Sequence, residues 1–219
     1  VSKAISYLYR IVVARFIGPD AYGQLSLGLM VLGVGTTIAA MALNQSLEKY
    51  IPEFRARNEE GKIKGIVFSV LYLSIPSSLL VSALMFFSAD FIAVDIFSNP
   101  NLASLIKIFS IAPFFSAVGK AFFSTTIGYN KIFYQTISVK VIQNLVQLLL
   151  TIALVILGFE VAGAAYGMVV GTIVSAILGL YFMEAKVGPI LRSKVKPDYQ
   201  YSKIIRFSGP LLLTGILGT

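Results

Sequence analysis

Residues 137–183, ISVKVIQNLVQLLLTIALVILGFEVAGAAYGMVVGTIVSAILGLYFM, contain two long apolar runs separated only by the turn Gly158-Phe159-Glu160. Each run is long enough to cross a lipid bilayer as a helix, which needs ~20 mostly apolar residues. Because the turn between them is so short, the two runs must form an antiparallel helical hairpin. This stretch predicts an all-α fold whose helices cross a membrane.

Similar apolar runs occupy most of the remaining chain. Complete runs lie at 24–47, 66–88 and 104–128, an incomplete one at 1–17, and a last one begins near 204. Gly18-Pro19-Asp20 separates the first two runs, because proline lacks a donor and disfavours the α conformation of the residue before it. We therefore predict a polytopic transmembrane helix bundle of about six spans plus a partial seventh.

The spans divide the chain into three parts. Residues 1–183 are expected to form an N-terminal transmembrane lobe with a truncated first helix, 184–203 a connector, and 204–219 the start of the seventh helix. Both ends of the sequence lie inside apolar runs, so we expect a fragment of a longer protein.

The composition excludes several functional classes. Only 13% of the residues are charged and 57% are hydrophobic, whereas soluble domains usually contain about 25% charged residues. The chain has no cysteine and no histidine, so it lacks disulfides, thiolate ligands, the usual general base and the commonest metal ligand. We expect no enzyme activity, no metal and no cofactor.

The charges alternate between loops. Basic residues concentrate at 48–65, 129–136 and 184–203, whereas the intervening loops at 18–23, 89–103 and 158–161 contain no Lys or Arg. Because Lys and Arg mark cytoplasmic loops, the three basic segments are predicted to be cytoplasmic in a multi-pass protein of the cell membrane. The net charge of +8 is then a topology signal, and nucleic acid is not an expected partner.

Lys120 is the most informative basic residue, because it lies deep within the 104–128 run. Ser116 and Ser124 flank it four residues away on the same helix face. A charge at this depth costs about 2.5–3.5 kcal/mol on insertion scales, so it usually faces a partner or a water-filled cavity. The alternative is that the side chain extends to the nearer, cytoplasmic surface; we favour the cavity.

A polar stripe follows in the next span. Lys140, Gln143, Asn144, Gln147 and Thr151 recur at the spacing of one α-helical face. Such a stripe could form hydrogen bonds between helices or line an aqueous cavity. Its length and the basic residue at one end favour the cavity.

Two further basic residues, Arg10 and Arg15, lie on the first span on different faces. Arg15 is near the outer end and could serve only as an anchor there, whereas Arg10 is deeper. No Asp or Glu occurs in the middle of any span. A polar lining of basic and amide groups suits an anionic ligand such as a phosphate or pyrophosphate.

Glycines recur along the sixth span at 163, 167, 171 and 179. Small residues at four-residue spacing allow transmembrane helices to approach closely. The alternative is that glycine is simply common in transmembrane helices.

Three segments resemble one family. They are residues 11–23 (IVVARFIGPDAYG), residues 50–57 (YIPEFRAR), and residues 112–131, which run from Ala112-Pro113 through Lys120 to Lys131. Together, and in this order, they resemble the oligosaccharide flippases, the polysaccharide-biosynthesis branch of the multidrug/oligosaccharidyl-lipid/polysaccharide exporter superfamily.

The resemblance implies two helical lobes facing a central cavity, of which this chain is the N-terminal one. It further implies that lipid-linked saccharides move across the membrane by alternating access, with basic cavity residues holding the phosphate or pyrophosphate. Lys120 matches a position where relatives often have arginine, and Arg15 matches the arginine of the first motif. Arg10 and Lys140 match no signature of the family.

The predicted function is therefore a flippase for polyprenyl-(pyro)phosphate-linked oligosaccharides. Its expected partners are that substrate, membrane lipids and the enzymes of polysaccharide synthesis. The closest alternative is a multidrug or toxin exporter on the same scaffold, which would need intramembrane carboxylates for cationic drugs. A membrane glycosyltransferase or polymerase and a structural or sensory bundle are weaker alternatives.

Overall fold

The computed structural model describes residues 13–217 except 14, 16, 41 and 42, with side chains described up to Pro210. All regular elements in this part of the chain are helical. The α-helices are α2 (Pro19–Ala40), α3 (Asn44–Ala56), α4 (Glu60–Phe87), α5 (Ala89–Phe91), α6 (Leu102–Phe109), α7 (Ala112–Gly128), α8 (Ile132–Ile137), α9 (Gln143–Ile156), α10 (Glu160–Phe182) and α11 (Tyr201–Leu217). Three π-helical turns, η1 (Ile92–Ile96), η2 (Ser138–Ile142) and η3 (Met183–Val187), complete the set.

The predicted membrane spans are confirmed. Within the described residues, five helical segments are long and apolar enough to cross a membrane. They are Pro19–Ala56, Glu60–Phe87, Leu102–Gly128, Ile132–Ile156 and Glu160–Val187. The expected first span at 1–17 falls almost entirely outside the described residues, and so does Arg10.

The expected loops are too long, because helices continue past the apolar runs. Helix α2 begins at Pro19 and α8 at Ile132, within the loops expected at 18–23 and 129–136. Within 48–65, α3 extends to Ala56 and α4 begins at Glu60. Leu47, Ile51 and Phe54 of α3 are fully buried at helical spacing, and this packing keeps the charged segment helical. The 89–103 connection likewise contains α5 and η1. Helix α11 begins at Tyr201, three residues before the expected 204.

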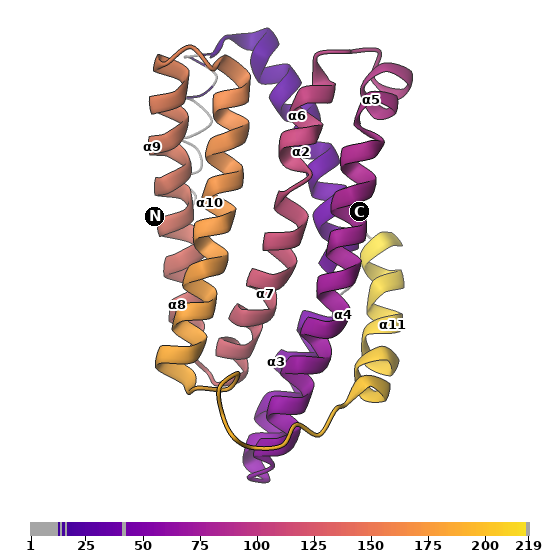
Figure 1. Ribbon diagram of the computed structural model, residues 1–219, viewed down its shortest axis with the longest axis vertical. Helices are drawn as coiled ribbons and strands as arrows, with labels where there is room; N and C mark the ends of the chain where they lie inside the picture. Colours follow the sequence, from indigo (N-terminus) through magenta and orange to yellow (C-terminus); the bar gives the residue numbers. More distant parts are fainter. Residues whose placement is uncertain (1–12, 14, 16, 41–42, 218–219) are drawn as a thin grey trace.

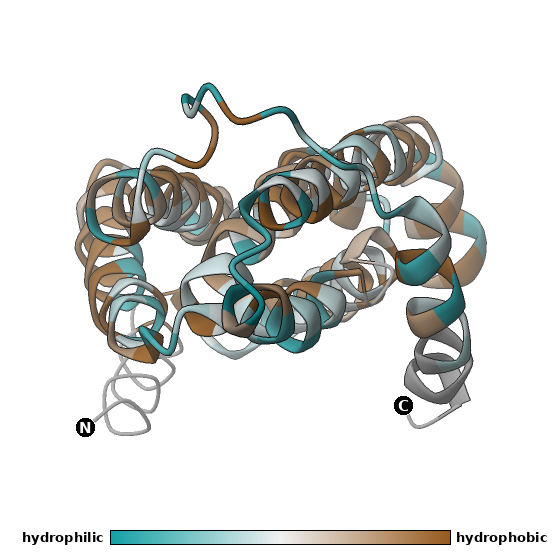
Figure 2. Ribbon diagram, turned by 90° about the horizontal axis from the view of Figure 1, so that it is seen from below, coloured by the Kyte–Doolittle hydropathy of each residue, from teal (hydrophilic) through white to brown (hydrophobic). Residues whose placement is uncertain are grey.

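The helices stand side by side in one elongated bundle (Figure 1). The segment formed by α6 and α7 is central, with 56% of its most apolar window buried, whereas α8 and α9 lie at the edge with 11%. Seen along the bundle (Figure 2), the connector between α10 and α11 is mostly hydrophilic and the helix sides are largely hydrophobic. This is the distribution expected where lipid surrounds the helices and water covers the ends.

Helices α9 and α10 form the predicted hairpin. Gly158 adopts a left-handed φ of +89°, and the amide of Phe159 donates to Leu154 O at 3.0 Å to close the turn. A Cβ on Gly163 would lie 2.9 Å from Leu154 Cβ, and one on Gly167 would lie 2.5 Å from Thr151 Oγ1. The glycines therefore serve close helix packing, as predicted.

Two hydrophobic clusters stabilise opposite ends of the bundle. One includes Leu102, Phe109 and Ala112 of the central span, and the other includes Ala121 and Phe122 of the same span. Of the α7 residues between these two sets, Val118 packs against the second cluster. The central span thus contributes to both clusters.

The connector between α10 and α11 is bound to the start of α4. The amide of Asp198 donates to Gly61 O at 2.9 Å, and the amide of Gln200 donates to Ser69 Oγ at 3.2 Å. A Cβ on Gly65 would collide with the backbone of Asp198. The connector thus packs against α4 at Gly61 and Gly65, where the absence of side chains leaves room for its backbone.

Candidate functional site

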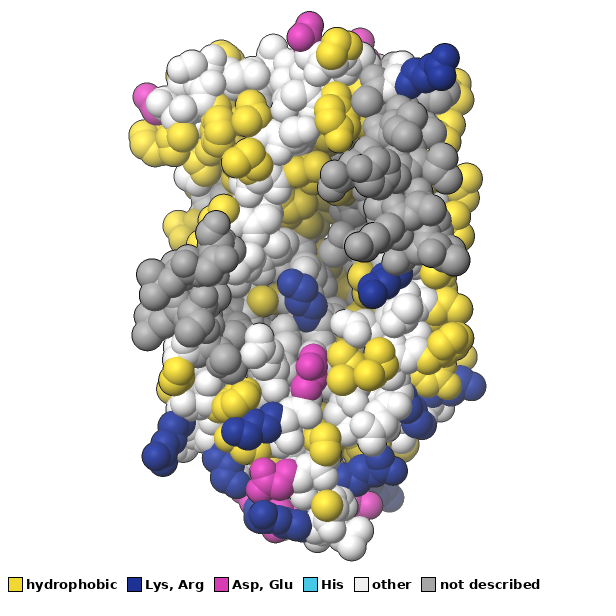
Figure 3. Space-filling view, turned by 180° about the vertical axis from the view of Figure 1, so that it is seen from behind, with side chains coloured by type: hydrophobic (Ala, Val, Ile, Leu, Met, Phe, Trp, Pro, Cys, Tyr) yellow, Lys and Arg dark blue, Asp and Glu magenta, His cyan; other side chains and the backbone are white. Residues whose placement is uncertain are grey.

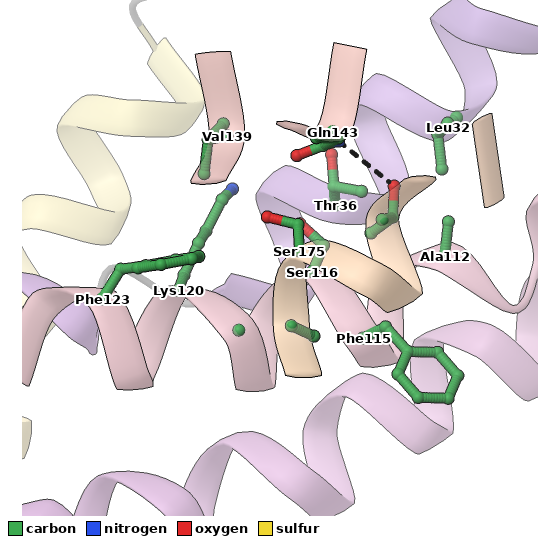
Figure 4. Close-up of a pocket in the computed structure, with 13 residues that line it drawn as sticks. Leu32, Thr36, Ala112, Phe115, Ser116, Lys120, Phe123, Val139, Gln143 and Ser175 are labelled. Atoms are coloured by element: carbon green, nitrogen blue, oxygen red, sulfur yellow. Dashed lines mark hydrogen bonds between the residues drawn. The ribbon is translucent and has the colours of Figure 1, made fainter. Parts of the chain in front are cut away.

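A cavity of about 220 Å³ opens at mid-height, between the two hydrophobic clusters. Its walls come from α2, α7, α10 and the segment formed by η2 and α9 (Figure 4). The central span breaks at Ser110 and Ile111 before α7 restarts with Pro113 in its first turn. This break and the π turn η2 both interrupt regular α-helix next to the cavity, which Ala112 and Val139 line.

Lys120 projects from α7 into this cavity (Figure 4). No acceptor, carboxylate or aromatic ring contacts its ammonium group among the described residues. Ser116, one turn earlier on α7, lines the same cavity. The structure thus agrees with the cavity orientation that the sequence favoured for Lys120.

The other polar groups of the cavity are amides and hydroxyls. Gln143 Nε2 lies 3.5 Å from Thr172 Oγ1, a long and weak hydrogen bond. Thr36 donates to Gly33 O at 3.0 Å, and Ser175 of α10 is buried beside Gln143 (Figure 4). These side chains offer donors and acceptors to a ligand around one positive charge.

The predicted polar stripe is divided between two environments. Gln143 lines the cavity, whereas Gln147 and Thr151 are buried against the glycines of α10. The structure thus places Gln143 at the cavity and packs Gln147 and Thr151 against α10, where Thr151 Oγ1 has no hydrogen-bond partner among the described residues. A role of the stripe in substrate binding stays a prediction. Lys140 lies within η2, and a π turn holds one residue more than an α turn. The side chain of Lys140 is therefore rotated around the helix axis relative to the residues of α9 that follow.

The remaining candidates do not line the cavity. Lys140 is exposed, and Asn144 donates its side-chain amide to Lys140 O at 3.0 Å. Arg15 is exposed on the helical segment before Gly18. Substrate-binding roles for these residues, and for Arg10 outside the described residues, stay predictions.

Thr36, Thr172 and Ser175 were not singled out from the sequence. Each is a hydroxyl on an apolar helix, where it could equally bond to its own backbone, as Thr36 and Thr172 do. Thr172 and Ser175 share one face of α10 at a spacing of three residues. That spacing was the one available signal, and it is weak because Ser and Thr are frequent at helix–helix contacts in membranes.

The charges divide between the ends of the bundle. Lys and Arg side chains gather over the lower end (Figure 3), which holds residues 55–64, 129–131 and 186–203 and is called the basic end below. There, burial raises the pKa of Tyr129, although the Arg55 guanidinium above its ring acts in the opposite direction. At the other end, Lys107 pairs with Asp90 at 2.8 Å. Lys120 therefore differs from the basic residues at either end in lying midway between them.

Comparison with known sequences identifies relatives of the whole chain. The family model described as "Polysaccharide biosynthesis protein" matches residues 1–219. Stage V sporulation protein B of Bacillus subtilis (strain 168) is 22% identical over 186 residues, which are 84% of this chain and 36% of that protein. The chain therefore spans about a third of this relative's length.

Solved structures show the same fold. An outward-facing multidrug resistance MATE family transporter of the MOP superfamily matches with a TM-score of 0.81 at 17% identity. A MOP superfamily transporter from Pyrococcus furiosus, described as having a binding pocket of reverse polarity that suggests a different function, matches with a TM-score of 0.69 at 15% identity. Each match covers 98% of this chain and 50% of the solved one, so the chain has the fold of half such a transporter.

Proposed function

Because the chain belongs to the polysaccharide biosynthesis protein family, we propose that it is one lobe of a transporter that flips lipid-linked oligosaccharides across the cell membrane. The substrate class is a saccharide joined to a polyprenyl carrier by a phosphate or pyrophosphate. Transport proceeds by alternating access between two lobes and involves no covalent chemistry. The basic end of the bundle, which the positive-inside rule assigns to the cytoplasm, is the side from which the substrate enters.

The ammonium of Lys120, which has no partner among the described residues, is the observation that carries this proposal. A polyprenyl-linked saccharide cannot carry its charged head through ~30 Å of hydrocarbon unaided. The cavity at Lys120 places one positive charge at mid-height, where the phosphate needs a counter-charge. A lysine left without an anion in a membrane is costly, which supports a ligand as its partner.

The surrounding side chains fit the sugar portion. Gln143, Thr172 and Ser175 provide amide and hydroxyl groups within the same cavity, and these groups hydrogen-bond sugar hydroxyls. One positive charge among neutral side chains that form weak hydrogen bonds gives a modest affinity for the substrate. Modest affinity is what a transporter needs, because a substrate held too tightly would not leave.

A multidrug exporter is the second candidate, since a multidrug resistance transporter shares the fold. Export of cationic drugs would require carboxylates in the cavity. Among the described residues that line the cavity, Lys120 is the charged one, and none of the lining residues is Asp or Glu. The polarity of the lining thus favours an anionic substrate.

The test uses the full-length protein in mild detergent, with native mass spectrometry to identify lipids that copurify. Wild type should retain a polyprenyl-phosphate saccharide, and Lys120→Ala should lose it. Lys120→Arg should keep it, because the charge is preserved. Lys107→Ala is the matched control, because that lysine is already paired with Asp90 at the outer end.

Two results would count against the proposal. Retention of the saccharide lipid by Lys120→Ala would exclude Lys120 as the phosphate contact. If wild type, after incubation with lipid-linked sugars, carried only bulk phospholipid and instead conferred drug resistance on cells, the exporter candidate would replace the flippase.

A further inference from the structure

One carboxylate lies close to the cavity, at its edge toward the basic end. Ser124 of α7 donates its hydroxyl to Glu48 Oε1 of α3 at 2.7 Å. Ser124 is four residues after Lys120 and on the same face of α7, so it lies about one helical turn from Lys120. Glu48 therefore lies next to the turn of α7 that follows Lys120.

The packing of α3 on α7 fixes this position. A Cβ on Gly128 would lie 2.8 Å from Ile51 Cβ, so the two helices touch directly one turn below Ser124. Leu47, the residue before Glu48, is fully buried in the hydrophobic cluster at the basic end. The backbone at Glu48 is therefore held beside α7, and its exposed side chain is hydrogen-bonded to Ser124.

Glu48 forms no ion pair with any described Lys or Arg. Lys49, its sequence neighbour, lies instead over the Phe207 ring, 4.2 Å from its centroid. Lys120 likewise has no ionic partner among the described residues. Two opposite charges are thus left without ionic partners in this part of the structure, and Ser124, which donates to Glu48, lies about one turn from Lys120 on α7.

We propose that Glu48 is the internal counter-ion of Lys120, and that it competes with the anionic head of the substrate for the Lys120 ammonium. This inference rests on the proposed function for the nature of the competing ligand. Residues four apart on a helix have Cβ atoms about 5–6 Å apart, a distance that a lysine side chain spans. When the cavity is empty, the ammonium is attracted to Glu48; when a phosphate enters, the ammonium turns to the phosphate.

The competition has a consequence for transport. The attraction of Glu48 lowers the affinity of Lys120 for phosphate and repels the phosphate directly, so the substrate can be released. It also keeps the empty cavity close to neutral, which lowers the cost of moving a charged site through the membrane on the return step. Glu48 is a residue that tunes affinity, whereas Lys120 contacts the substrate.

Binding of a polyprenyl pyrophosphate without sugar to the purified full-length protein tests this proposal. Glu48→Gln should tighten binding about tenfold, equivalent to about 1.4 kcal/mol. Ser124→Ala should weaken binding about threefold, because Glu48 loses its hydroxyl partner and turns to Lys120. Glu53→Gln is the matched control on α3, since Glu53 is paired with Arg57 at 3.1 Å, and it should bind as wild type does.

The variants distinguish a failure of the counter-ion role from a failure of the proposed flippase function. If Lys120→Ala weakens binding but Glu48→Gln equals wild type or binds less tightly, the counter-ion role is wrong and the flippase proposal stands. If the probe does not bind wild type, the flippase proposal fails at this step. The counter-ion role is then decided by thermal unfolding of the ligand-free protein, for Glu48→Gln, Lys120→Gln and the double variant. Non-additive changes in melting temperature support the pair, and additive changes overturn it.

Discussion

Helix α10 faces two different environments, a closed seam with α9 and an open cavity with α7. Along the seam, a Cβ on Gly163, Gly167 or Gly171 would meet α9 at 3.1 Å or less. Beside the cavity, α10 carries Thr172 and Ser175 in place of glycine, and it approaches α7 closely where Ala176 meets Gly119 and where Gly179 meets Phe122 and Phe123. On α10, glycines thus occupy the surface that packs closely on α9, whereas Thr172 and Ser175 occupy the surface that borders the cavity.

Closing the seam depends most on Gly167. Gly167→Leu should destabilise the protein by at least about 3 kcal/mol, because the new side chain would overlap Thr151 and the backbone of Gln147. Thermal unfolding in detergent and the yield of folded protein measure the effect. Gly33→Leu on α2 is the matched control, because a Cβ there meets nothing within 4 Å. Equal stability of the two variants would show that the seam does not need glycine.

Removing the charge from the cavity should raise the stability of the protein, whereas filling the seam lowers it. In the Glu48→Gln background, which removes the proposed counter-ion, Lys120→Met should stabilise the ligand-free protein by about 2 kcal/mol, because it removes the remaining unpaired charge from the membrane interior, while abolishing binding of a polyprenyl pyrophosphate. The melting temperature and a binding titration on the same sample test both parts. A fall in melting temperature would mean that Lys120 has a structural partner, and the comparison between seam and cavity would lose its basis.

A buried hydroxyl in the seam offers a smaller test. Thr151 Oγ1 is buried without a hydrogen-bond partner within the described structure, so Thr151→Val should raise stability by about 1 kcal/mol. Thr125→Val is the matched contrast, because Thr125 donates to Ala121 O at 2.9 Å and is equally buried. It should lower stability by a similar amount. Chemical or thermal unfolding should show that the stabilities of the two variants change in opposite directions. Changes in the same direction would contradict the view that the Thr151 hydroxyl lacks a partner and the Thr125 hydroxyl has one.

The smallest change in stability is expected at the boundary between seam and cavity. Gln143→Leu removes only the 3.5 Å contact with Thr172, so the free energy of unfolding should change by less than about 0.5 kcal/mol. Binding of a saccharide-bearing probe should weaken more than binding of the sugar-free one, because Gln143 is assigned to sugar hydroxyls. Equal weakening of both would place Gln143 at the phosphate instead.

Much of the fold could be predicted because lipid imposes simple rules on sequence. Apolar length gave the spans, and the short turn at Gly158 gave the hairpin. Lys120 was found because a charge deep in an apolar run has few explanations. The extension of α3 to Ala56 was missed, since that segment is charged and its helix is stabilised by burial of Ile51 and Phe54.

The division of the α9 stripe was also beyond the sequence. Regular α-helical spacing put Lys140 and Gln143 on one face, but the π turn η2 changes the rotation between them. Such turns insert one residue without a sequence signal of their own. The role of Glu48 was hidden for a different reason, because its partner Ser124 is distant in the sequence.

The sequence alone determined that this is a multi-pass helical membrane protein of a recognisable family, with a basic residue deep in one span. These features follow from hydrophobic length and charge placement, which each segment carries by itself. Only the tertiary structure decided which polar residues share a cavity, which are packed against glycine, and that the connector is docked on α4. Those outcomes depend on how close two helices can approach, and that distance is set jointly by side chains from separate parts of the chain.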